Sequence, residues 1–121
     1  MNLQANVETG RLGEKLAEDY LKKQGYKIID KNWHYSKNAE IDIIAVQKDV
    51  LVFVEVKTRK TTNFGHPFEA INRDKINKLH TAIYGYMSSK NLNYKNFRLD
   101  GIGIIGLENP KIEHIKNIGQ F

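Results

Sequence analysis

The spacing of apolar residues along the chain predicts two helices. From residue 10 to residue 25, apolar side chains recur at helical intervals beside a polar face, at Leu12, Leu16, Tyr20 and Leu21. Gly25 is suited to end this helix, because glycine readily adopts the left-handed backbone of a helix C-terminus. After Asn72, a suitable N-cap, a second apolar face extends to about Lys90 through Ile76, Leu79, Ile83, Tyr86 and Met87.

Runs rich in β-branched residues predict the strands. They span residues 26–30 continuing into 33–35, then 40–46, 50–57, 97–105 and 111–116. The polar residues 58–66 predict a loop, and Pro67 opens a helical region after it. The predicted order of elements is therefore helix, three strands, helix and two strands.

The strands at 40–46 and 50–57 are apolar on both faces. In the first of them, Ile41, Ile43 and Ala45 are expected to point one way, and Ile44 and Val46 the other. A strand that is buried on both faces needs a covering layer on each side. We therefore expect helices on both sides of the sheet, in an α/β/α sandwich.

Length and composition set the limits of this fold. A chain of 121 residues predicts a single domain over residues 1–121, with a core from about 10 to 116. The 19 basic and 14 acidic residues give a net charge of +5, a mild bias toward polyanions. The absence of cysteine excludes a disulfide framework, a thiol nucleophile and Cys-ligated zinc. Without a signal-like N-terminus or a long apolar run, we expect a cytoplasmic protein that does not span a membrane.

Three charged residues interrupt the apolar hairpin: Asp42, Glu55 and Lys57. Such side chains are rarely buried unless they are paired. If the hairpin turns through Lys48 and Asp49 alone, Asp42 lies directly opposite Glu55 and on the same face of the sheet. A three-residue turn would instead place the two carboxylates on opposite faces.

Two opposed carboxylates repel each other and need a counter-charge. Mg²⁺, or Mn²⁺ in its place, is suitable, because Mg²⁺ binds through one or two carboxylates and keeps waters and substrate phosphate as its other ligands. Lys57 shares a face with Glu55, so it would orient or deprotonate an attacking water, or stabilise charge on phosphorus. The three residues are therefore suited to metal-assisted phosphodiester hydrolysis.

A simpler interpretation of the same charges stays open. In the two-residue register, Lys57 lies opposite Glu40. A half-exposed edge hairpin would then carry an ordinary ion pair of Lys57 with Glu40 or Glu55, worth ~0–1 kcal/mol.

Several segments, in this order and spacing, resemble the bacterial YraN-like family of small uncharacterised proteins. They are residues 10–14, 40–45, 52–57 followed by Arg59, Phe64-Gly65 with Glu69-Ala70, and 98–100. That family is similar to PD-(D/E)XK nucleases of the archaeal Holliday junction resolvase type. The resemblance implies a restriction-endonuclease-like α/β/α sandwich with a central mixed sheet flanked by helices.

The resemblance also assigns roles to individual residues. It implies that Asp42 and Glu55 hold the metal, that Lys57 is the motif lysine, and that Glu14 completes the set as an acid from the first helix. On the helix, Glu14 borders the predicted apolar face and would reach the sheet. The alternative for Glu14 is an ordinary first-turn acid favoured by the helix dipole.

Basic residues after the hairpin are candidates for phosphate contacts with DNA. They are Arg59, Lys60, Arg73 and Lys75. For Arg73 and Lys75, a solvated helix face would give the same pattern. The glycines of residues 101–106 match a dinucleotide-binding motif in letters only, because a turn and no helix follows them. They are better explained as small residues that keep one face of a strand thin, so that a helix can pack closely against it.

The sequence therefore predicts a Mg²⁺-dependent or Mn²⁺-dependent endonuclease acting on DNA, with branched DNA as one candidate substrate. A homodimer is expected if the junction-resolvase analogy holds, because two strands must be cut symmetrically. The alternatives are a non-catalytic nucleic-acid-binding module and a protein-interaction domain.

Overall fold

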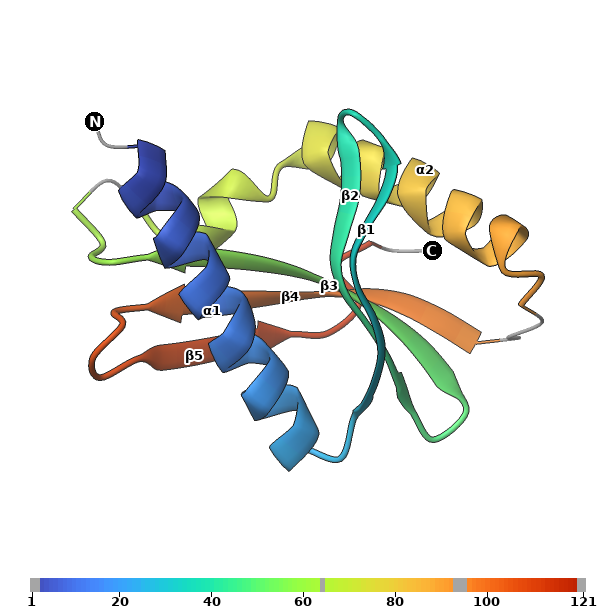
Figure 1. The fold of residues 1–121 in the computed structure, drawn as a ribbon, viewed down its shortest axis with the longest axis horizontal. Coiled ribbons are helices and arrows are strands. Elements are labelled where there is room, and N and C mark those ends of the chain that lie inside the picture. The colour runs from blue at the N-terminus through green and yellow to red at the C-terminus, as the bar shows by residue number, and fades with distance from the viewer. Residues whose placement is uncertain (1–2, 64, 93–95, 120–121) are drawn as a thin grey trace.

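The apolar stretches of the chain form a five-stranded sheet with a helix on each face, as the computed structural model shows in Figure 1. The structure describes residues 3–63, 65–92 and 96–119, so Phe64 of the family-like segments lies outside it. The elements are α1 (Leu3–Lys23), β1 (Lys27–Ser36), β2 (Ala39–Gln47), β3 (Val50–Arg59), the 3-10 helix η1 (Pro67–Ala70), α2 (Arg73–Ser89), β4 (Asn96–Ile105) and β5 (Lys111–Ile115).

The strands lie in the order β1-β2-β3-β4-β5, and β3 pairs with β4 in parallel while all other neighbours are antiparallel. A core around Leu21, Val52 and Val54 lies between the sheet and α1. A second core around Phe53 and Ile83 lies between the sheet and α2. The predicted restriction-endonuclease-like α/β/α sandwich with a mixed sheet is thereby confirmed.

Helix α1 differs from its prediction in its start and in its buried face. It begins at Leu3 and not at residue 10, and Thr9 Oγ1 donates to the carbonyl of Ala5 within this extra length. Leu12, predicted to face the core, is 53% exposed. The buried face runs through the small residue Ala17 to Leu21, because small side chains let the helix approach the sheet closely.

The end of α1 agrees with the prediction. Gly25 has a positive φ of 90°, the Gly25 N–H donates to the carbonyl of Lys22, and the Tyr26 N–H donates to that of Leu21. This hydrogen-bond pattern is the Schellman motif that closes helices at a left-handed glycine. The chain thus turns directly from α1 into β1.

The hairpin of β2 and β3 has the predicted two-residue turn. Gln47 pairs with Val50, and the same register continues to Ile43 opposite Val54. The next residue of β2, Asp42, accepts a hydrogen bond from the backbone of β3 through its side chain instead. From this point β2 turns away from β3, while its pairing with β1 continues (Figure 1).

The divergence of β2 corrects one predicted side-chain direction. Ile41 packs with Trp33 in the core under α2, whereas Ile43 packs under α1. Between these two residues, Asn32 of β1 lies opposite Asp42, and the positions on either side of it are paired. Asn32 has a positive φ of 50°, which interrupts the normal alternation of side chains along a strand.

Two further expectations concern β4 and membranes. A Cβ added at Gly101 or Gly103 would lie 3.2 Å from the ring of Phe68 in η1, so these glycines thin a packed strand face as predicted. Among the described residues, no helix has the length and apolar character needed to cross a bilayer.

Candidate active site

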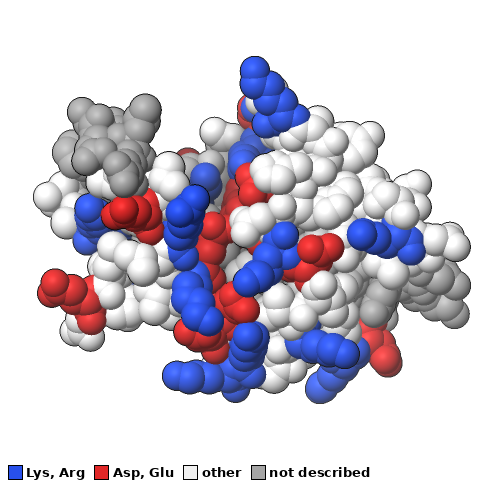
Figure 2. Space-filling view, viewed as in Figure 1, with Lys and Arg blue, Asp and Glu red and all other residues white. Residues whose placement is uncertain are grey.

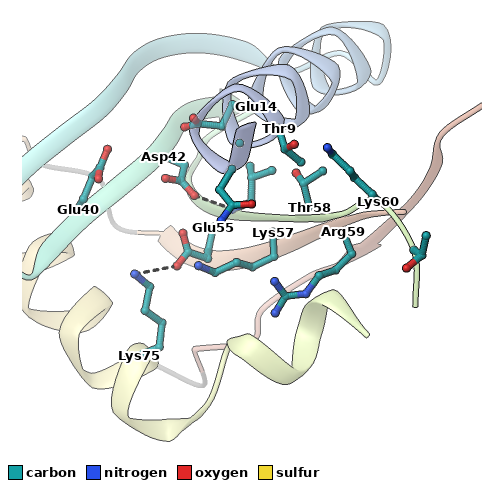
Figure 3. Close-up of a pocket in the computed structure, with 14 residues that line it drawn as sticks. Thr9, Glu14, Glu40, Asp42, Glu55, Lys57, Thr58, Arg59, Lys60 and Lys75 are labelled. Atoms are coloured by element: carbon teal, nitrogen blue, oxygen red, sulfur yellow. Dashed lines mark hydrogen bonds and ion pairs between the residues drawn. The ribbon is translucent and has the colours of Figure 1, made fainter. Parts of the chain in front are cut away.

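The divergence of β2 from β3 opens a cleft of about 870 Å³ between α1, the sheet and α2 (Figure 3). Its acidic lining residues are Glu14, Glu40, Asp42 and Glu55. Its basic lining residues are Lys57, Arg59, Lys60 and Lys75. On the face shown in Figure 2, acidic side chains lie in a recess with Lys and Arg side chains on both sides. All four predicted catalytic residues therefore meet in one cleft.

The carboxyl groups of Asp42 and Glu55 lie close enough to interact on the cleft floor. Asp42 Oδ2 also accepts the N–H of Val56 at 2.8 Å, which fixes the Asp42 side chain against β3. Burial raises the pKa of Asp42 well above its usual range, the contact with Glu55 raises it further, and the Val56 N–H acts in the opposite direction. Asp42 therefore retains a proton at a higher pH than an exposed aspartate does.

Glu55 lies on a central strand and is only 2% exposed. Lys75 Nζ, from the first turn of α2, lies 3.2 Å from Glu55 Oε2. The Lys75 ammonium lies outside the directions in which Glu55 Oε2 can accept a hydrogen bond, so this buried oxygen accepts none. The half-exposed edge hairpin that the sequence also allowed is thus wrong for Glu55.

Glu14 joins the pair from α1, and Figure 3 shows its carboxylate above Asp42. Burial and the negative charges of Glu40 and Glu55 raise the pKa of Glu14, against the opposing effect of Lys31. Glu14 thus belongs to the same electrostatic group as the carboxylates of the hairpin. The interpretation of Glu14 as an ordinary first-turn acid is wrong, since α1 begins at Leu3 and Glu14 lies in the middle of the helix.

Asn32 is a site residue that the sequence did not reveal. With its amide nitrogen turned toward the carboxylates, Asn32 donates to Glu14 Oε1 at 2.8 Å and to Glu40 Oε1 at 3.3 Å. Asn32 therefore bridges α1 and β2. The available signal was an asparagine within a strand, where this residue is disfavoured unless a special backbone conformation needs it.

Lys57 lies on β3 in the same cleft, and Figure 3 shows its side chain extending along the carboxylate side of the strand. The predicted pairing with Glu40 does not occur. Glu40 instead lies 3.6 Å from His34 Nε2, and the ion pairs of the described residues include none of Lys57. The ammonium of Lys57 is thus available to a ligand of the cleft.

Three of the four predicted DNA-contacting residues line the cleft. Arg59 and Lys60 follow Lys57 at the end of β3, whereas Lys75 faces Glu55 from α2. Arg73 is exposed at the start of α2 and does not line the cleft. Lys75 therefore contacts Glu55 of the carboxylate pair. The sequence predicted instead that Lys75 lies on a solvated or DNA-facing surface of the helix.

The carboxylate pair meets the requirements of a Mg²⁺ or Mn²⁺ site. Glu55 Oε2 is a buried carboxyl oxygen without a hydrogen bond, and Asp42 lies beside it. Within the described part of the chain, no three His, Asp or Glu side chains form a ready metal cage. Such a site fits a hard cation that takes one or two carboxylates and retains its waters.

The segment at 98–100 has a separate structural role. Asp100 is fully buried and accepts hydrogen bonds from Arg98 Nε at 2.9 Å, His114 Nε2 at 2.8 Å and the N–H of Asn117 at 3.0 Å. His114 also contacts the hydroxyl of Tyr20 on α1. This network ties β4, β5 and α1 together, so His114 has a structural role.

The model of the family described as Uncharacterised protein family UPF0102 matches residues 13–104. The chain belongs to the UPF0102 family. The match contains all four predicted catalytic residues, and the predicted resemblance to the YraN-like family is confirmed.

UPF0102 relatives from distant bacteria align along nearly their whole length. A UPF0102 protein of Paenarthrobacter aurescens (strain TC1) is 41% identical over 111 residues, which cover 90% of this chain and 91% of the relative. One of Flavobacterium johnsoniae is 41% identical over 112 residues, covering 89% and 90%. One of Alkaliphilus metalliredigens is 41% identical over 108 residues, covering 89% and 94%.

Proposed function

We propose that this UPF0102 protein is a metal-dependent nuclease that hydrolyses phosphodiester bonds of DNA. The observation that carries the proposal is the interacting pair of buried carboxyl groups of Asp42 and Glu55 at the floor of an open cleft. Burying two like charges side by side destabilises a fold, and apolar residues would pack a central strand better. A pair of this kind is therefore expected to serve a ligand, and a divalent cation is the ligand that it fits.

In this proposal Asp42 and Glu55 hold Mg²⁺ or Mn²⁺. A cation bound there would polarise a phosphate oxygen and increase the acidity of a water. Glu14, whose pKa is raised by burial, would accept a proton from the attacking water. Lys57 Nζ would stabilise the charge that develops on the phosphate.

Hydrolysis adds one water across a phosphorus–oxygen bond. The water oxygen bonds to phosphorus, and the ester oxygen departs and takes up a proton. Arg59 and Lys60, at the rim of the same cleft, would bind neighbouring phosphates and keep the strand in position. Branched DNA is one candidate substrate, and a twofold dimer would then supply two such clefts.

The proposal is tested with labelled linear duplex, single-stranded and four-way-junction DNA in Mg²⁺, Mn²⁺ or EDTA. We expect cleavage in the metal-containing reactions alone. Asp42→Asn keeps the side-chain shape and the hydrogen bond to Val56, and should reduce the rate on the order of 100-fold, as loss of a metal ligand or acid–base group does. Lys78→Met, on the exposed side of α2, is the matched control and should cut at the wild-type rate.

Other results would favour the other candidates. DNA binding without cleavage, equally strong in wild type and Asp42→Asn, would support a binding module. Neither binding nor cleavage of any DNA would support a protein-interaction domain.

A further inference from the structure

Lys75 brings a positive charge to the oxygen that the proposed metal would need. Its Nζ lies 3.2 Å from Glu55 Oε2, and its side chain is 29% exposed while Glu55 is buried. Figure 3 shows Lys75 reaching up from α2 to the carboxylate at the cleft floor. The cleft thus contains a cation of the protein itself beside the carboxylate pair.

The contact between Lys75 and Glu55 can be broken by movement of the Lys75 side chain alone. The backbone of Lys75 is fixed, because its N–H donates to the N-cap Asn72 at 2.9 Å. The ammonium does not make a directed hydrogen bond to Glu55 Oε2, so its attraction is mainly electrostatic. Glu55 is held on a central strand, whereas the long, partly exposed Lys75 side chain can leave without any backbone movement.

Lys75 and a divalent cation cannot both occupy Glu55 Oε2. A cation bound at about 2.1 Å from this oxygen would stand within a few ångströms of the ammonium. Two positive charges at such a distance in a partly buried site repel strongly. Metal binding must therefore displace Lys75 from Glu55.

We propose that Lys75 is an internal counter-ion that competes with the metal for Glu55. In the metal-free protein Lys75 neutralises the buried carboxylate, and it leaves when the metal binds. Lys75 thereby lowers the affinity for metal and sets the metal concentration at which the site fills. This inference rests on the proposed metal site, and it assigns Lys75 a role different from that of Lys57, which makes no ion pair with a described residue.

The test is Mn²⁺ binding without DNA, measured by electron paramagnetic resonance of free Mn²⁺ in wild type and four variants. Lys75→Met should tighten binding roughly tenfold, equivalent to about 1.4 kcal/mol, because the competing charge is removed. Lys75→Arg retains a charge at this position and should stay close to wild type. Glu55→Gln should lose Mn²⁺ binding at this site.

Lys78→Met is the matched control for net charge. Lys78 lies on the same helix and pairs with the exposed Asp74 at 3.1 Å, outside the cleft. Its removal should leave Mn²⁺ binding within about twofold of wild type, because distant surface charges are screened.

The outcomes separate the two proposals. Unchanged or weaker Mn²⁺ binding in Lys75→Met, with binding still lost in Glu55→Gln, would overturn the role of Lys75 and leave the metal site standing. Equal gains in Lys75→Met and Lys78→Met would also overturn it, because net charge would then explain the effect. Mn²⁺ binding that is the same in Glu55→Gln as in wild type would overturn the metal site and the inference together.

Discussion

At the scale of single residues, the carboxylate pair is an unfavourable arrangement for folding and a favourable one for binding a cation. Burial and the neighbouring Glu55 both raise the pKa of Asp42, so the charged form of Asp42 is disfavoured in this place. Natural proteins place such destabilising groups where a ligand makes use of them. The metal-free protein should therefore become more stable when one of these charges is removed.

Asp42→Asn tests this expectation. The amide oxygen can accept the Val56 N–H as Asp42 does, and the amide nitrogen can donate to Glu55. In EDTA we expect the variant to be more stable by on the order of 1 kcal/mol, the usual contribution of one hydrogen bond, seen as a higher Tm in thermal unfolding. Added Mg²⁺ should make the difference in Tm between Asp42→Asn and wild type smaller, since bound Mg²⁺ stabilises the wild type more than the variant.

Asp49→Asn, in the exposed hairpin turn, is the control for loss of one negative charge. A lower Tm for Asp42→Asn than for Asp49→Asn in EDTA would show that the pair does not strain the metal-free fold.

Asp100 has the opposite effect on stability. Burial alone would raise the pKa of Asp100, but hydrogen bonds from His114, Arg98 and Asn117 outweigh burial and lower it below the usual value. The folded protein therefore binds the Asp100 proton less readily than the unfolded chain does. The resulting stabilisation is complete above the unfolded pKa and is lost as the pH falls through the folded pKa.

Urea unfolding of wild type and Asp100→Asn as a function of pH measures this contribution. Near neutral pH the variant should be less stable by about 3 kcal/mol, because one partner of a buried charged network is lost. The difference should shrink as the solution is acidified below about pH 4. Asp19→Asn, at an exposed ion pair with Lys15, is the control. A difference in the free energy of unfolding between wild type and Asp100→Asn that stays constant with pH would contradict the lowered pKa of Asp100.

At the scale of elements, the close approach of α1 to β3 brings Glu14 to the carboxylate pair. A Cβ at Gly13 would collide with Thr58 Oγ1 on β3, whereas a Cβ at Gly10 would meet nothing within 4 Å. Gly13 thus permits the contact between helix and sheet. Gly10 leaves space at the cleft that it lines.

Two glycine-to-alanine substitutions in the same helix should therefore have opposite effects. Gly10→Ala should stabilise the fold by about 0.5–1 kcal/mol, the usual gain in a helix interior. Gly13→Ala should destabilise it by about 1–3 kcal/mol, because α1 must shift away from Thr58. Urea unfolding of both variants checks the prediction, and a gain in stability for Gly13→Ala would contradict it.

Much of the fold could be predicted because its signals are local. The two-residue turn at Lys48 and Asp49 agrees with the prediction, and its register brings Asp42 to the side of Glu55. Ile41 lies on the face opposite to the predicted one, and no local pattern in its own strand indicates the positive φ of Asn32 on the neighbouring strand. The contact of Lys75 with Glu55 joins α2 to β3, and no local pattern indicates it.

At the scale of the whole molecule, the net charge of +5 favours association with polyanions, and four basic residues line the cleft. The cleft combines acidic residues at its floor with Arg59 and Lys60 at the end of β3. A polyanion would be attracted to these basic residues while the floor charges are neutralised by a cation. In the proposed function, the cleft would thus hold both a DNA strand, through these basic residues, and a metal ion, through the carboxylates at its floor.

DNA affinity should accordingly depend on salt. On a plot of log affinity against log salt for duplex DNA, each phosphate contact contributes a slope of about −0.9. Lys60→Ala should therefore make the slope shallower by about one. Lys111→Ala, on β5 and outside the cleft lining, should not change it. Equal slopes for wild type and Lys60→Ala would contradict the placing of DNA along this cleft.

In the proposed function, Glu55 and its partner carboxylate Asp42 carry the metal-dependent chemistry. The most direct measurement is the single-turnover rate of cleavage of labelled DNA in Mg²⁺ by wild type and by Glu55→Gln, with DNA binding measured for both. The account predicts that wild type cuts in Mg²⁺ and not in EDTA, and that Glu55→Gln binds the DNA but cuts it at least about 100-fold more slowly. Cleavage by Glu55→Gln at the wild-type rate, or cleavage by wild type in EDTA, would contradict it.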